Sequence, residues 1–161
     1  MRIGITGHQN LNIAVIDWLK HELFIEINQL NVNEAFSCLA IGADQIFAAI
    51  VLANEIPLTA VVPCLNYETT FDSNGLALYK NLLSRSKNTI KLNFEKPTEN
   101  AFFEAGKTVV SNSDILFAIW DNLPAKGLGG TADIVSFASS LNKKIIHLNP
   151  ITKTKTFINY G

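Results

Sequence analysis

Short runs of apolar, β-branched residues alternate along this chain with longer segments in which apolar residues recur every three or four positions. The first pattern is typical of strands, and the second is typical of amphipathic helices. Strands that alternate with helices of ten or more residues form βαβ units, whose strands lie parallel in one sheet. The alternation therefore predicts an α/β fold with a mainly parallel sheet.

Strands are predicted over residues 2–6, 36–40, 58–62, 89–92, 115–120 and 144–148. Helices are predicted over residues 12–30, 44–54, the second half of 67–86, 98–110 and 131–141, and Thr98 is the expected N-cap of its helix. The run 115–120 is continuously apolar, as a strand covered on both faces must be. We expect a Rossmann-like, doubly wound sheet of five to six strands with helices on both faces.

The length bounds the number of domains. A chain of 161 residues matches one domain and is too short for a (β/α)8 barrel, for which about 250 residues are typical. We expect a single domain over residues 1–150. Residues 151–161 show no clear period and are expected to form a C-terminal extension.

Composition narrows the class of protein. Hydrophobic residues make up 48% of the chain and charged residues 17%, which excludes a disordered segment. With a net charge of −1 and scattered Lys and Arg, we expect no nucleic-acid partner. No apolar run reaches the roughly 18 residues of a membrane span, so no membrane partner is expected. Cys38 and Cys64 lack metal-ligand spacing and are expected to be free thiols in the cytoplasm; neither a metal nor a cofactor is expected.

Three predicted strands end in loops of small and polar residues. Ligands of parallel sheets bind at the carboxyl ends of the strands, where glycine lets the backbone approach a ligand and a helix N-terminus attracts anions. A phosphate or phosphate-like ligand is therefore predicted. The expected contact residues are Gly7, His8, Gly42, Ala43, Asp44, Asp121, Lys126, Gly127, Gly129, Gly130 and Thr131.

Each loop also has a purely structural interpretation. Gly7 can make a tight turn, and Asp44 can cap a helix instead of binding a ribose hydroxyl. Asp121 can bind a ribose or simply begin its loop, whereas Thr131 can cap its helix and bind phosphate at the same time. Three glycines within residues 127–130, followed by Thr131, exceed what a turn requires.

Four segments carry a resemblance to a known family. They are Arg-Ile-Gly-Ile-Thr-Gly-His at residues 2–8, Gly-Ala-Asp at 42–44, Ser-Asp-Ile-Leu-Phe-Ala-Ile-Trp-Asp at 113–121 and Gly-Leu-Gly-Gly-Thr-Ala-Asp at 127–133. In these segments the chain resembles the SLOG superfamily, the Rossmann-like domains that include the LOG and DprA families. The resemblance implies that a nucleotide or nucleotide-derived ligand binds at this edge of the sheet.

Members of this superfamily include both ligand sensors and enzymes. Some are sensors coupled to effector domains, and others are phosphoribohydrolases with the pattern Pro-Gly-Gly-x-Gly-Thr-x-x-Glu and an arginine on the preceding helix. Here Ile134 occupies the glutamate position, Asp133 stands one residue earlier, and the predicted helix 98–110 has no arginine. These differences favour a sensor or ligand-binding module that acts with a separate effector protein.

The alternative is an enzyme. It would be an N-glycosidase, phosphoribohydrolase or nucleoside deoxyribosyltransferase-like protein acting on a nucleotide or nucleoside. Asp133 or Glu104 would then be the catalytic carboxylate that assists departure of the base. The mean hydropathy of +0.20, together with the pairing of related families through their helices, predicts a homo-oligomer.

Overall fold

A single sheet of seven strands runs through the protein in a computed structural model that describes residues 1–161. The strands are β1 (Arg2–Gly7), β2 (Glu34–Ser37), β3 (Leu58–Val62), β4 (Asn88–Lys91), β5 (Ile115–Ile119), β6 (Lys144–Asn149) and β7 (Thr154–Ile158). The helices are α1 (Ile13–Gln29), α2 (Ala43–Ala53), α3 (Ser73–Arg85), α4 (Glu99–Asn112) and α5 (Thr131–Ser140), with one 3-10 turn, η1 (Tyr67–Thr70). None of these helices combines the length and the apolar character that a membrane span requires.

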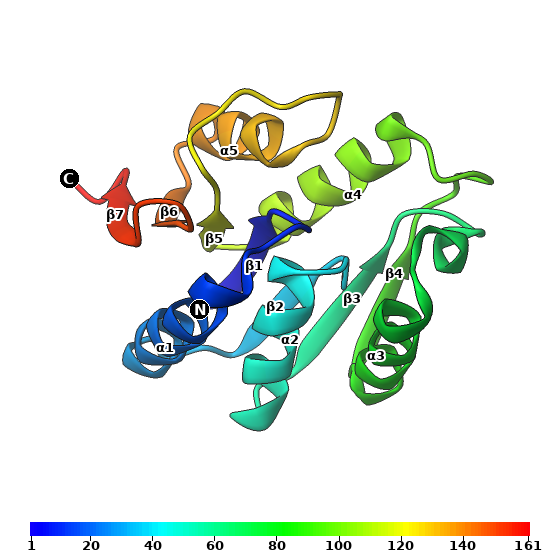
Figure 1. Cartoon of the computed structure of the whole chain (residues 1–161), viewed down its shortest axis with the longest axis horizontal. Coiled ribbons are helices and arrows are strands. Elements are labelled where there is room, and N and C mark those ends of the chain that lie inside the picture. Colours follow the sequence, from blue (N-terminus) through cyan, green and yellow to red (C-terminus); the bar gives the residue numbers. More distant parts are fainter.

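The sheet order is β4-β3-β2-β1-β5-β6-β7. Every neighbouring pair from β4 to β6 is parallel, and β7 alone runs antiparallel, against β6. Helices α1, α2 and α3 cover one face of the sheet, and α4 and α5 cover the other (Figure 1). The predicted Rossmann-like, doubly wound fold is confirmed.

The core is divided by the sheet into two layers. Ile3 and Ile5 of β1 belong to a cluster of 24 buried residues that also includes the inner faces of α1 and α2. A second cluster of 11 buried residues joins the inner faces of α4 and α5 to the opposite side of the sheet. Side chains of successive strand residues point to opposite faces, so these strands are apolar on both sides, as the continuous run at residues 115–120 predicted.

The structure contains one strand more than the sequence predicted. β7 lies within residues 151–161 and pairs with β6 over its whole length, so this segment extends the sheet. Its sequence, Thr-Lys-Thr-Phe-Ile, lacks a continuous apolar run because an edge strand has only one neighbour and is largely open to solvent. The division into a domain over residues 1–150 and an extension stays a prediction.

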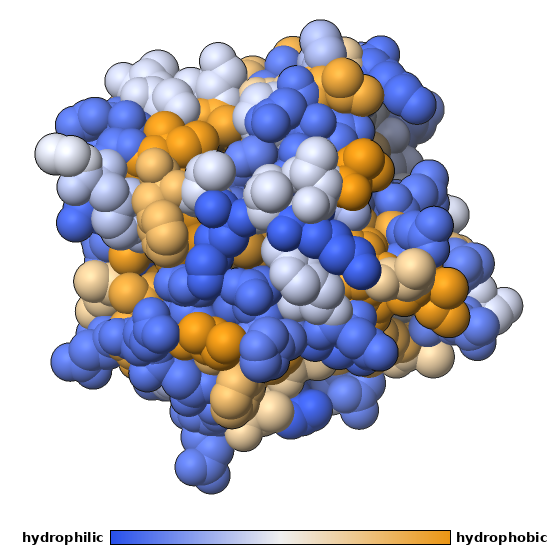
Figure 2. All heavy atoms as spheres, turned by 60° about the vertical axis from the view of Figure 1, so that its left-hand side comes forward, coloured by the Kyte–Doolittle hydropathy of each residue, from blue (hydrophilic) through white to orange (hydrophobic).

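The face that includes β7 carries scattered apolar groups. Figure 2 shows hydrophobic side chains there in small groups between hydrophilic ones. Phe157 and Tyr160 are among the exposed large apolar residues, and their rings meet edge to face with centroids 5.2 Å apart. Self-association of the chain stays a prediction.

Candidate functional site

A cleft of about 860 Å³ opens at the carboxyl edge of the sheet. The chain adds β2, β3 and β4 on one side of β1 and then adds β5, β6 and β7 on the other, so the strand order reverses between β1 and β5. The loops that leave these two strands diverge, which is the position at which open α/β sheets bind ligands. The cleft is lined by the loops that follow β1, β2 and β5, together with residues of α4 and η1.

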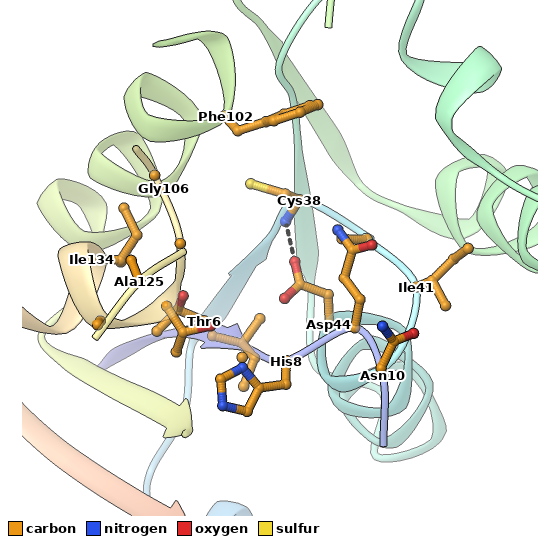
Figure 3. Close-up of a pocket in the computed structure, with 18 of the residues that line it drawn as sticks. Thr6, His8, Asn10, Cys38, Ile41, Asp44, Phe102, Gly106, Ala125 and Ile134 are labelled. Atoms are coloured by element: carbon orange, nitrogen blue, oxygen red, sulfur yellow. Dashed lines mark hydrogen bonds between the residues drawn. The ribbon is translucent and has the colours of Figure 1, made fainter. Parts of the chain in front are cut away.

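Asp44 lies at the β2 side of this cleft and is buried, with 6% of its surface exposed. Its Oδ2 accepts hydrogen bonds from the Cys38 backbone N–H at 3.0 Å and from Ser37 Oγ at 3.2 Å (Figure 3). Burial raises the pKa of Asp44 to about 7, against the opposing effect of hydrogen bonds from Ser37, Ala40 and Cys38. Asp44 therefore does not cap α2. It ties the start of α2 back to the end of β2.

Gly42 is the actual N-cap residue of α2, and no side chain caps this helix. Its φ is +89°, and a Cβ at this position would collide with the backbone oxygens of His8 and Gln9. The Ala43 N–H also donates to the His8 carbonyl at 3.1 Å. Gly42 and Ala43 thus hold the loop after β1 against the start of α2. Neither lines the cleft, whereas Gly7 does.

His8 and Asp121 join the loop after β1 to the loop after β5. His8 Nε2 lies 3.1 Å from Asp121 Oδ1 and 3.1 Å from the Asp121 backbone N. The pKa of Asp121 lies below its ordinary value, chiefly because the Leu123 N–H donates to the carboxylate and also because His8 lies beside it. Both side chains line the cleft and remain partly open to it, with exposed fractions of 29% and 23%.

The glycine-rich loop after β5 leads into α5 without a side-chain cap at Gly130. Its geometry is held by Asp133, whose Oδ2 accepts the Gly129 N–H at 2.9 Å. The backbone N–H groups of Gly130, Thr131 and Ala132 have no acceptor within the chain, and all three residues line the cleft. Lys126 lines it as well, whereas Gly127 does not. The sequence allowed Thr131 to cap this helix. In the structure Thr131 is instead the first helical residue, and Gly130 is the N-cap residue.

The two carboxylates named as catalytic candidates lie outside this cleft. Glu104 forms an ion pair with Lys107 one turn further along α4. Asp133 lines a smaller surface groove between α4 and α5, with Phe103 and Phe137. Their catalytic assignment stays a prediction.

The sequence placed Tyr67 and Glu68 just after the third predicted strand, where they could close over a base, but it did not indicate the rest of the aromatic side of the cleft. Tyr67 is buried, donates its hydroxyl hydrogen to the Cys38 carbonyl at 2.9 Å, and contacts Phe71 with ring centroids 5.0 Å apart. Phe102 of α4 lies across the cleft, with its ring centroid 6.3 Å from that of Tyr67. The position of Tyr67 just after β3 was a local signal, but nothing near Phe102 in the sequence indicated that it would meet Tyr67.

Fold and cleft together define a Rossmann-like α/β domain with a ligand-sized hollow at its topological switch point. No family model and no curated protein sequence matches the chain. Solved structures with the same fold include DNA processing protein A (DprA) from Streptococcus pneumoniae, with a TM-score of 0.66 and 14% identity over 92% of this chain. They also include DprA from Helicobacter pylori, with a TM-score of 0.67 and 17% identity over 92% of this chain.

A third structure with this fold is that of TM1055, a structural-genomics target, with a TM-score of 0.59 and 14% identity. It also aligns with 92% of this chain. The chain spans 50% of S. pneumoniae DprA, 65% of H. pylori DprA and 74% of TM1055. At these identities the likeness establishes the fold.

The prediction that excluded nucleic acid as a partner is wrong. The H. pylori DprA structure, which shares this fold, is described as showing a single-stranded DNA binding mode. A net charge of −1 does not exclude such binding, because single strands are also held by local grooves and aromatic stacking. The whole-chain charge was therefore insufficient ground for the exclusion.

Proposed function

We propose that this domain is a SLOG-type ligand-binding module that holds a nucleotide or nucleotide-derived ligand, of the nucleoside phosphate or ADP-ribose type, in the cleft. The observation that carries the proposal is the set of three unpaired N–H groups, at Gly130, Thr131 and Ala132, which line the cleft at the start of α5. Such groups and the positive end of the helix dipole bind phosphate oxygens. The fold shared with DprA and TM1055 supports the superfamily assignment.

The charge of the phosphate would be balanced without arginine. The chain has two arginines, Arg2 and Arg85, and neither lines the cleft. Lys126 lines the cleft, and its ammonium group is a positive charge on a flexible side chain that can approach the phosphate. It would take the place of the planar guanidinium group of an arginine. The cleft volume of about 860 Å³ lies within the range of small-molecule sites.

Ligand binding, and not turnover, is the proposed output. A catalytic acid or base must lie within hydrogen-bond reach of the reacting atoms or one water away, and the two predicted catalytic carboxylates, Asp133 and Glu104, do not line the cleft. The carboxyl groups that do line it, Asp44 and Asp121, accept hydrogen bonds that hold the neighbouring loops together. In the proposed role the bound domain acts on a separate effector protein.

The test is saturation-transfer NMR with AMP, ADP-ribose and NAD, combined with a charge variant of the cleft. Thr131→Glu places a carboxylate beside the free N–H groups and is expected to abolish binding. Ser136→Glu, which places the same charge on an exposed position of the same helix outside the cleft, is the matched control and should bind normally.

Two results would contradict the proposal. Absence of transfer to every phosphate-bearing ligand would exclude the nucleotide site. Appearance of free base during incubation over several hours would show that the protein is the N-glycosidase of the alternative hypothesis.

A further inference from the structure

The end of the cleft remote from α5 has a different chemical character. We call it the aromatic chamber, and it is formed by Ile41, Pro63, Tyr67, Phe71, Pro97 and Phe102. Figure 3 shows the Phe102 ring on one side of this space and Asp44 on the other, with Cys38 between them. The walls are thus apolar and aromatic, and one carboxyl group is buried at the bottom.

We infer that the aromatic chamber holds a nucleobase and that Asp44 selects a base that presents N–H donors. The inference rests on the proposed function, because it orients the ligand whose phosphate the start of α5 would bind.

The walls of the chamber match a flat heterocycle. Tyr67 is fully engaged, since its ring packs edge to face against Phe71 and Tyr79 and its hydroxyl is bonded to Cys38. Phe102 is only partly buried and lines the cleft, so part of its ring remains available. Bases stack on such aromatic rings irrespective of their sequence identity.

The bottom of the chamber supplies the selectivity. Ser37 Oγ and the Cys38 N–H both donate to Oδ2 of Asp44, and the Ala40 backbone also donates to the carboxyl group, so that the group is held in place. A buried carboxylate accepts hydrogen bonds and gives none. A base with an amino group or a ring N–H would donate a hydrogen bond to the Asp44 carboxylate. A base edge that carries acceptors alone would place its lone pairs against those of the carboxylate, and it would displace water without replacing the hydrogen bond that water donates.

The spacing of the strands gives the distance between the β2 side and the β5 side of the cleft. Asp44 belongs to α2 but is hydrogen-bonded to Ser37 and Cys38 at the end of β2. Gly7 ends β1, Asp121 follows β5, and β2, β1 and β5 are adjacent in that order. Neighbouring strands are about 4.8 Å apart, so the outer two are on the order of 10 Å apart. A sugar would lie over the end of β1, between the base and the phosphate.

The test compares the affinities of ribose 5-phosphate, purine riboside 5′-monophosphate, AMP and GMP by calorimetry at pH 8. Purine riboside lacks both the amino group and the ring N–H. We expect purine riboside 5′-monophosphate to bind about tenfold more tightly than ribose 5-phosphate, because of stacking. The tighter of AMP and GMP should bind about tenfold more tightly again, through a charge-assisted hydrogen bond.

Two variants assign these steps to residues. Phe102→Leu should remove the first tenfold step and leave the affinity for ribose 5-phosphate unchanged, while Phe103→Leu, one position along α4 and outside the cleft, should remove nothing. Asp44→Asn should remove the second step, with its folding checked by circular dichroism and thermal unfolding. The comparison among the ligands on the unmodified protein stands even if this variant does not fold.

The outcomes separate this inference from the proposed function. If ribose 5-phosphate binds and the nucleotides bind no more tightly, the chamber does not hold a base, and the phosphate site stands. If purine riboside 5′-monophosphate equals both AMP and GMP, Asp44 does not select the base. If no phosphate ligand binds at all, both proposals are wrong.

Discussion

Asp44 links the stability of the protein to pH. Its pKa is about 7 in the folded chain, against an ordinary value of 3.8, so between these values the folded state keeps a proton that the unfolded state has lost. The stabilising contribution is complete below about pH 4 and is lost as the pH rises towards 7. Urea unfolding between pH 4 and 8 should show the unmodified protein losing up to about 1.4 kcal/mol per pH unit relative to Asp44→Asn. Parallel pH profiles for the two proteins would contradict this expectation.

Gly129 is required by the packing of the glycine-rich loop on α4. Its φ is +85°, and a Cβ would lie 2.8 Å from the Phe103 N and 3.0 Å from the Glu99 O, both backbone atoms. Gly129→Ala should therefore destabilise the protein by about 1–3 kcal/mol in thermal unfolding. Gly127→Ala is the control, because its Cβ would meet only the flexible end of the Glu99 side chain. Equal losses in both variants would show that the backbone contact of Gly129 is not the cause.

At the scale of elements, β7 is joined to α1 by a partly buried charge cluster. Lys155 Nζ lies 2.8 Å from Glu22 Oε2 and 2.6 Å from Glu26 Oε1, and only 6% of Glu26 is exposed. Lys155→Met should destabilise the fold by about 2 kcal/mol, because it leaves Glu26 buried without its partner. Adding Glu26→Gln should recover part of this loss in urea unfolding. Lys153→Met, at an exposed position with no ion pair, should change stability by less than about 0.5 kcal/mol.

Some helices and strands could be predicted from nearby residues in the sequence, and others depend on residues that are far away in the sequence. Strands β1 to β6 and the helix capped by Thr98 were predictable, because apolar runs and caps act within a few residues; Thr98 does accept from the Ala101 N–H. β7 was not predictable, since Lys155 is held by α1, more than 120 residues earlier. The role of Asp44 depended on nearer residues, Ser37 and Cys38, but on the conformation of the loop between β2 and α2, which no apolar pattern predicts.

The position of the candidate site could be predicted from the sequence, but the residues that line it could not. The three loops were predicted correctly to meet at one edge, because parallel strands bring their carboxyl ends together. Which residues line the cleft was not predictable: Gly42 and Gly127 do not, because Gly42 lies against the backbone of His8 and Gln9 and Gly127 lies against the Glu99 side chain of α4. Phe102 and Tyr67 are 35 positions apart and meet only through the folding of α4 across the sheet.

At the scale of the whole molecule, the sheet places its most protected strands beside the cleft. β5 is buried throughout and pairs along its length with β1 on one side and β6 on the other. β4 and β7 each have one neighbouring strand and are largely exposed. The strand residues that line the proposed ligand site, Ile5, Thr6 and Gly7, belong to β1, which pairs with β5 at the centre of the sheet, and no residue of β4 or β7 lines it.

This arrangement predicts a gradient of amide hydrogen exchange from the centre of the sheet to its edges. Amides of β1 and β5 should exchange only through global unfolding, while those of β4 and β7 should exchange through local opening, at least a hundredfold faster. Mass-spectrometric exchange on peptides that cover each strand would measure the difference. Equal protection of β7 and β5 would show that the charge cluster of Lys155 makes the edge as stable as the centre, and the expected gradient would then be wrong.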